Sequence, residues 1–315
     1  MPNVYLFTMK TLILFLLSFP HFAKDLVVPP DGSADYRTIQ EAVMAVRDHS
    51  QEKVKIIIKE GVYPEKLVIP SWKPNLHLVG EGKVRIIGDD YSGKPLPTRD
   101  AVGNSTFVTY TTYVVLVDAD NITFENLTIE NIAGPISQAV ALHVEGDKFE
   151  GRNCTFLGNQ DTLFASREGT MQYYVGCRIE GTTDFIFGKA MAVFDRCVIH
   201  SKKKSYITAA ATPKGQAYGF VFLDCTLTAD HGIKDVYLGR PWRPYAQTVF
   251  IRTEMGGHIH PDGWDNWRDP ENEKTVLYGE YGSKGAGAGK RRVKWTKTIN
   301  NVEQYTVKEI FKGWK

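Results

Sequence analysis

The sequence has no strong excess of charge of either sign. Lys and Arg number 38 and Asp and Glu number 36, which gives a formal net charge of +2 over 315 residues. A charge this small does not favour nucleic acid or an anionic membrane as a partner. Beyond the N-terminus no apolar stretch is long enough for a membrane helix, so we expect the mature chain to contact neither nucleic acid nor membrane.

Several motifs of common catalytic and metal sites are also missing. The chain contains no G-x-S-x-G turn of a serine hydrolase, and Gly285–Lys290 (GAGAGK) lacks the spacing of a phosphate-binding loop. There is no C-x-x-C pair, and His258 and His260 have no third metal ligand at a suitable spacing. We therefore expect neither a metal ion nor a cofactor.

The N-terminal residues have the layout of a secretory signal peptide. Lys10 precedes the apolar run Thr11–Phe19, and Pro20 and Ala23 follow it. The run is too short to cross a bilayer, although a frayed N-terminal strand is an alternative. We predict a signal peptide over residues 1–23, export to the periplasm or the exterior, and one domain over residues 24–315, since no linker is visible.

Cysteine is scarce, but its positions mark a repeat. Cys154, Cys177, Cys197 and Cys225 lie in RNCTF, VGCRI, DRCVI and LDCTL, and Leu127 in ENLTI fits the same frame. These positions recur every 20 to 28 residues, each with an apolar residue two positions later. Short strands at this interval, with no room for a helix between them, predict an all-β fold: a right-handed parallel β-helix, or solenoid.

In such a solenoid the cysteines would form an interior column. We expect buried free thiols there, with disulfides or a metal site as the alternatives. Ahead of the strands, Thr38–Ser50 predicts a short capping helix with Thr38 as N-cap, Glu41 completing a capping box, and apolar residues on one face. Past about residue 256 the strand pattern gives way to an irregular C-terminal tail.

Two aspartates share one phase of this repeat. Asp161 lies seven residues after Cys154, and Asp184 lies seven residues after Cys177. On adjacent strands their side chains would be roughly 5 Å apart. Two carboxylates this close raise each other's pKa, so one can stay protonated as a general acid while the other acts as nucleophile or base. An exposed ladder of turn aspartates is the alternative.

Other polar residues could serve this pair. Gln160 adjoins Asp161, and Gln138 lies about one coil earlier, so their amides could stabilise an oxyanion. Arg240 could hold a carboxylate with two hydrogen bonds, and Trp242 offers a flat face of the kind on which sugars stack. Taken alone, each of these residues also fits a purely structural role.

With these residues gathered, the chain resembles the pectin methylesterase (pectinesterase) family. The resemblance runs from about Asp35 to Trp295 and includes the late segments PDGWDNW and EYGSKGAGAGKRRVKW. It is carried by five ordered motifs: GVYPE at Gly61–Glu65, QAVAL at Gln138–Leu142, GNQDTL at Gly158–Leu163, DFIFG at Asp184–Gly188 and LGRPW at Leu238–Trp242.

The resemblance implies a parallel β-helix that hydrolyses the C6 methyl ester of galacturonate units in methyl-esterified homogalacturonan (pectin). It assigns Asp184 as nucleophile, Asp161 as general acid and then base, Gln138 and Gln160 as oxyanion stabilisers, and Arg240 as the group that holds Asp184. It also implies substrate contacts for Trp242 and Phe187. Strand alternation puts Phe187 opposite Asp184, so we expect a bend near Gly188.

The residues themselves leave two other functions open. Carboxylates at this separation also suit a retaining glycoside hydrolase acting on pectin, and the solenoid could be a non-catalytic polysaccharide-binding protein. The two glutamines favour ester hydrolysis, because an oxyanion hole serves acyl transfer. The chain departs from the family at His143, where Arg is common, which bears on substrate preference. We expect a monomer.

Overall fold

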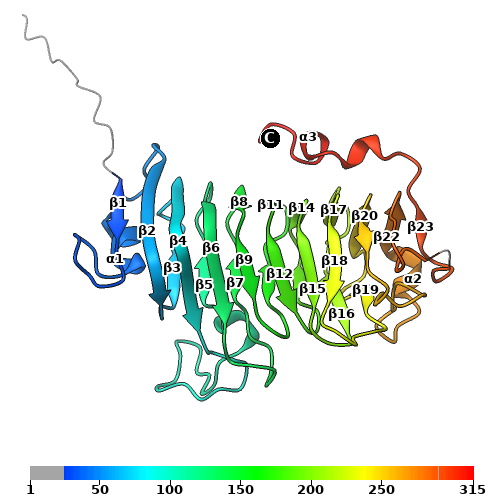
Figure 1. The fold of residues 1–315 in the computed structure, drawn as a ribbon, viewed down its shortest axis with the longest axis horizontal. Coiled ribbons are helices and arrows are strands. Elements are labelled where there is room, and N and C mark those ends of the chain that lie inside the picture. Colours follow the sequence, from blue (N-terminus) through cyan, green and yellow to red (C-terminus); the bar gives the residue numbers. More distant parts are fainter. Residues whose placement is uncertain (1–24, 290) are drawn as a thin grey trace, which may run out of the picture.

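The computed structural model describes residues 25–289 and 291–315. The predicted signal peptide lies outside these residues. All strand pairings between the named strands are parallel, and successive coils stack along one axis (Figure 1). The predicted right-handed parallel β-helix is confirmed.

Most strands belong to a large sheet with two limbs that meet at β6. It begins with β1 (Leu26–Val28), β2 (Val54–Tyr63), β4 (Leu76–Gly88) and β6 (Thr123–Asn131). The first limb contains β8 (Phe149–Arg152), β11 (Met171–Val175), β14 (Met191–Asp195), β17 (Phe220–Leu223), β20 (Gln247–Ile251), β22 (Leu277–Tyr281) and β23 (Lys297–Thr298). The second limb contains β9 (Thr155–Leu157), β12 (Arg178–Gly181), β15 (Val198–Ser201), β18 (Thr226–Ala229) and β21 (Glu254–Met255).

A smaller sheet forms the remaining side of each coil. Its seven strands are β3 (Leu67–Ile69), β5 (Val115–Val117), β7 (Leu142–Val144), β10 (Leu163–Ala165), β13 (Ile186–Gly188), β16 (Tyr206–Ala210) and β19 (Tyr237–Pro241). We call it the small sheet. Four of the predicted site residues stand before its middle strands, and Phe187 and Arg240 lie within its strands, so this sheet positions the site.

The interior repeats from coil to coil as the sequence predicted. Cys154, Cys177, Cys197 and Cys225 are buried free thiols, each placed just before a strand of the second limb. Burial is the main cause that raises the pKa of the Cys177 thiol well above its usual value. A neighbouring column of aromatic rings stacks at centroid distances of 4.9, 4.5 and 4.3 Å, from Tyr174 through Phe194 and Phe222 to Phe250.

Helix α1 (Ile39–Ala45) covers the N-terminal end of the solenoid. The Thr38 hydroxyl accepts a hydrogen bond from the Glu41 backbone N–H at 3.0 Å, as predicted. The capping box is incomplete, because the Glu41 carboxylate accepts from the Arg37 N–H and not from Thr38. Glu65 of the GVYPE motif accepts from the first two helical N–H groups, Ile39 and Gln40, and so ties the helix to the first coil.

The predicted start of the C-terminal tail was wrong. The strands do not end near residue 256. After α2 (Asn272–Thr275) the chain adds β22, which pairs with β20, and then β23, which pairs with β22. The tail after β23 runs back across the first limb and contains η2 (Glu303–Tyr305) and α3 (Val307–Ile310) (Figure 1). Its buried residues, such as Phe311, pack on outward-facing residues of that limb, such as Val249.

Candidate active site

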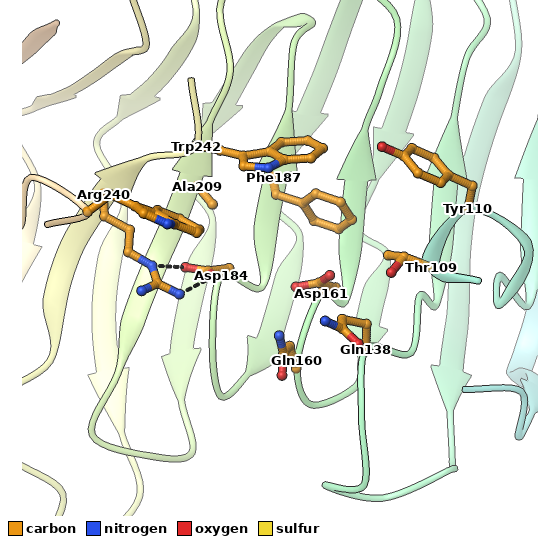
Figure 2. A pocket seen from close by; sticks show the side chains of 11 residues that line it. Thr109, Tyr110, Gln138, Gln160, Asp161, Asp184, Phe187, Ala209, Arg240 and Trp242 are labelled. Atoms are coloured by element: carbon orange, nitrogen blue, oxygen red, sulfur yellow. Dashed lines mark hydrogen bonds and ion pairs between the residues drawn. The ribbon is translucent and has the colours of Figure 1, made fainter. Parts of the chain in front are cut away.

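A pocket of about 230 Å³ lies on the outer surface of the small sheet (Figure 2). All seven predicted site residues line it. The complete lining is Thr109, Tyr110, Gln138, Gln160, Asp161, Asp184, Phe187, Ala209, Arg240, Trp242 and Trp267. Residues separated by more than a hundred positions in sequence are therefore brought together by the stacking of coils.

The two aspartates hold equivalent positions in adjacent coils. Leu163 in β10 pairs with Ile186 in β13, which places Asp161 opposite Asp184 in the same register. Both have left-handed backbone conformations, with φ of 65° at Asp161 and 50° at Asp184. Their exposed fractions are only 8% and 5%. The predicted neighbouring carboxylates are thus present, and they are buried.

The surroundings of the two carboxyl groups differ. Burial raises the pKa of Asp161 well above its usual value, and the nearby charge of Asp184 raises it further. Burial also raises the pKa of Asp184, but hydrogen bonds and charge from Arg240 oppose this rise. Of the two, Asp161 is therefore the carboxyl that holds its proton more strongly, and Asp184 is the more readily ionised.

Arg240 in β19 binds Asp184 through two nitrogen atoms. Its Nε donates to Oδ1 at 2.9 Å and its Nη2 to Oδ2 at 2.6 Å. The guanidinium lies between two aromatic rings, 3.9 Å from the centroid of Tyr206 and 3.7 Å from that of Trp267. This sandwich fixes the plane of the guanidinium and hence the direction in which the Asp184 carboxylate faces.

Gln138 and Gln160 also lie one coil apart, joined by a parallel β-bridge. The Ser137 hydroxyl donates to Gln138 Oε1 at 2.8 Å, which orients that amide. Figure 2 shows the side-chain nitrogens of both glutamines turned toward the two carboxylates. Two N–H donors beside a carboxylate pair are suited to stabilising negative charge on an oxygen atom placed between them.

Aromatic rings form the floor on the other side of the carboxylates. Phe187 stacks on Phe164 with ring centroids 4.2 Å apart, and Trp242 meets Phe187 edge-on at 5.9 Å. The alternation of the strand is broken at Asp184 itself, since Phe185 and Ile186 are both buried in the core. The backbone also bends at Gly188, where φ is 129°. However, the break that places Phe187 on the pocket side lies at Asp184, three residues before Phe187.

Sequence reasoning missed several residues of this site. Trp267 ends the PDGWDNW segment, which was part of the resemblance but was given no role. Tyr206 lies on β16 and pairs in register with Tyr237 of β19, a relation that only the aligned coils reveal. Thr109 and Tyr110 belong to η1 (Thr109–Thr111), inside a long excursion between β4 and β5 for which no repeat pattern exists.

Two further properties concern residues 25–289 and 291–315 alone. No helix within these ranges is both long and apolar enough to cross a membrane. Within the same ranges, no three His, Cys, Asp or Glu side chains are grouped so as to hold a metal ion.

Comparison with known proteins identifies the family. The profile described as Pectinesterase matches residues 25–314. The chain belongs to the pectinesterase family. Pectinesterases are carboxylic ester hydrolases, so the family and enzyme class predicted from the motifs are confirmed.

Individual relatives agree with this assignment. The chain is 36% identical over 303 residues to the probable pectinesterase/pectinesterase inhibitor 16 of Arabidopsis thaliana, covering 92% of this chain and 56% of the relative. It therefore spans little more than half the length of that relative. The structure of pectin methylesterase from carrot superposes with a TM-score of 0.81 at 32% identity, covering 90% of this chain and 92% of that one. A pectin methylesterase mutant in complex with a hexasaccharide superposes with a TM-score of 0.79 at 28% identity, covering 92% and 97%.

His143, the residue at which the chain departs from the family, lies beside the pocket. His143 is 5% exposed, its Nε2 lies 2.8 Å from Glu145 Oε1, and its ring centroid is 4.4 Å from that of Phe164. The imidazole therefore packs against Phe164 from the neighbouring strand and does not line the pocket itself.

Proposed function

We propose that this pectinesterase hydrolyses the methyl ester at C6 of galacturonate units in methyl-esterified homogalacturonan, giving demethylated pectin and methanol. The observation that carries the proposal is the unequal carboxyl pair. Asp161 has surroundings that raise its pKa, whereas Asp184 is bound by Arg240 and faces two amide donors. Acyl transfer needs this combination of nucleophile, acid and oxyanion donors.

In the first half of the reaction, an Asp184 oxygen attacks the ester carbonyl carbon. The carbonyl oxygen becomes an oxyanion, which the side-chain N–H groups of Gln138 and Gln160 stabilise. The C–O bond to the methoxy group then breaks, and Asp161 gives its proton to the departing methanol. The products of this step are methanol and an anhydride between Asp184 and the C6 carboxyl.

In the second half, water replaces methanol beside Asp161, which is now ionised. Asp161 takes one proton from the water, and the resulting hydroxide attacks the C6 carbonyl carbon of the anhydride. The bond to Asp184 breaks and releases the galacturonate carboxyl. Asp161 is protonated again and Asp184 is ionised again, so the pair returns to its starting state.

Phe187 and Trp242 are proposed to contact the sugar units of the polymer. Both rings line the pocket, and ring faces of this kind pack against the apolar C–H surface of a sugar. The related pectin methylesterase that was crystallised with a hexasaccharide supports an oligosaccharide ligand for this fold. The amide donors favour ester hydrolysis over glycoside cleavage, because an oxocarbenium ion carries positive charge.

We also propose that the protein acts outside the cytoplasm as a single-domain monomer. The signal-peptide pattern and a polymeric cell-wall substrate support export. The continuous stacking of coils from β1 to β23 supports one domain.

One experiment tests the proposed function. Purified protein is incubated with highly methylated pectin while methanol, new reducing ends and unsaturated products are measured. We expect methanol without chain cleavage. Reducing ends without methanol would instead support a glycoside hydrolase, and the absence of every product would leave only polysaccharide binding.

A further inference from the structure

A second hollow, of about 180 Å³, lies on the large sheet, away from the residues that line the active-site pocket. It is bordered by residues around the starts of β2 and β6, by β8 and the residues just before it, and by the end of the C-terminal tail. Four cations and one carboxylate line it: Lys53, Lys148, Arg152, Lys315 and Glu150. None of the residues proposed to act in catalysis lines this hollow.

The cations in this hollow are incompletely neutralised. Arg152 and Lys315 share Glu150, at 2.8 and 2.7 Å, and Arg152 also lies 4.0 Å from a carboxylate oxygen of Glu125. Lys53 donates only to the neutral Thr123 hydroxyl, at 2.9 Å. Within residues 25–289 and 291–315, neither Lys53 nor Lys148 has an acidic side chain within ion-pairing distance. Four cations therefore face two carboxylates, so the hollow carries an excess of positive charge.

This concentration has a physical cost in the free protein. Partial burial lowers the pKa of Lys53, and the neighbouring charge of Arg152 lowers it further. A bound anion would relieve both the repulsion and the lack of hydrogen-bond acceptors. Asn121 and Thr123 add neutral polar groups, and Trp314 adds an aromatic ring at the border. The cations can pair with a carboxylate, the neutral polar groups can hydrogen-bond to sugar hydroxyls, and the aromatic ring can pack against a sugar ring. The hollow therefore suits a sugar that carries a carboxylate.

We propose that this hollow binds de-esterified galacturonan, the product of the proposed reaction, at a second site distinct from the active-site pocket. The inference rests on the proposed function for the identity of its ligand. Each turnover adds one negative charge to the polymer, so the affinity of this hollow for the polymer rises as the reaction proceeds. A long chain held here stays at high effective concentration near the active site.

The binding experiment uses unesterified galacturonan oligomers, which are not substrates, and follows amide NMR shifts of the full chain. We expect saturable shifts at Asn121, Lys148 and Trp314. Lys53→Gln combined with Lys148→Gln should weaken this site about tenfold, because two charge-assisted contacts are lost. Neither lysine has an acidic partner, so the fold should be retained. Lys83→Gln removes an exposed lysine outside the hollow and should leave the affinity for the oligomers unchanged.

A kinetic arm separates this site from the active site. With partly de-esterified pectin, the double variant should show a higher KM at unchanged kcat, while methyl-esterified oligomers too short to reach both sites should show no difference. Missing shifts at the hollow, shifts that the double variant retains, or equal affinity for a sulfated glycan would overturn the proposal. Methanol release by the unmodified protein is measured in parallel, so failure of the proposed function is recognised separately.

Discussion

Asp161 and Asp184 are the same residue type in the same phase of adjacent coils, yet their surroundings make them chemically different. Both are buried, which raises the pKa of each. Asp184 also has a cationic partner, since both oxygens of its carboxylate accept from Arg240. A single arginine, held between Tyr206 and Trp267, therefore makes Asp184 the more readily ionised of the two.

Asp184→Asn should reduce methanol release about 10⁴-fold, because the amide cannot act as the nucleophile. The matched control is Asp224→Asn. Asp224 also has a positive φ, of 51°, and its carboxylate also accepts two hydrogen bonds, from Arg252, but it lies outside the pocket. The control should keep its activity. A fully active Asp184→Asn variant with an unchanged melting temperature would refute the nucleophile assignment.

Arg240→Gln should shift the pH dependence of activity. The pKa of Asp184 is already raised by burial, and Arg240 limits that rise. Without the cation the pKa rises further, so the ionised nucleophile appears only at higher pH. The acidic limb of a plot of kcat/KM against pH should move upward, and Arg240→Lys should move it less. An acidic limb that stays in place in both variants would contradict this account.

Asp161→Asn should make the protein more stable while it reduces activity. The folded-state pKa of Asp161 is raised, so this carboxyl lowers stability as pH rises from its reference pKa of 3.8 through the folded value. The gain in melting temperature should be present at pH 7 and should shrink as pH falls toward 4. A gain that is equal at both pH values would show that the charge of Asp161 is not its cause.

Strands and turns set the geometry that these residues use. The turn between the two limbs repeats a left-handed residue in successive coils: Asn153, Gly176, Arg196, Asp224 and Arg252. Each stands immediately before Cys154, Cys177, Cys197, Cys225 or Thr253. A left-handed residue at the same point of each coil keeps the next side chain directed inward, which explains the column of small buried groups.

The cysteine column predicts how the thiols respond to reagents. The four thiols are buried and free, and burial raises the pKa of Cys177, so little thiolate is available. Native protein should not react with Ellman's reagent, and unfolding without reductant should release all four thiols. Fewer reactive thiols after unfolding would indicate disulfides, the alternative that the sequence left open.

At the scale of the whole molecule, stacked coils supply every group of the proposed reaction as a side chain. The pocket draws residues from η1 to the segment after β21, a span of Thr109 to Trp267. The chemistry needs only carboxyl, amide and guanidinium groups. Incubation with EDTA should therefore leave methanol release unchanged, and restoration of lost activity by added Ca²⁺ would reveal a metal requirement.

The sequence by itself determined the repeat and its chemistry. The spacing of the cysteines gave the coil length, and the same spacing placed Asp161 and Asp184 in one phase, because in-register stacking converts equal intervals into neighbouring positions. The ordered motifs identified the family and all seven predicted pocket residues. The roles of those residues stay predictions.

Only the tertiary structure decided the features that do not repeat. Trp267 and Tyr110 reach the pocket, and Tyr206 reaches Arg240, from segments with no common interval, so no pattern in the sequence could place them. The left-handed backbone at Asp184 put Phe187 on the same side as the carboxylate, against the alternation expected of a strand. Burial and the nearness of Arg240 separate the two aspartates in pKa, because both depend on distances across coils and not on order along the chain.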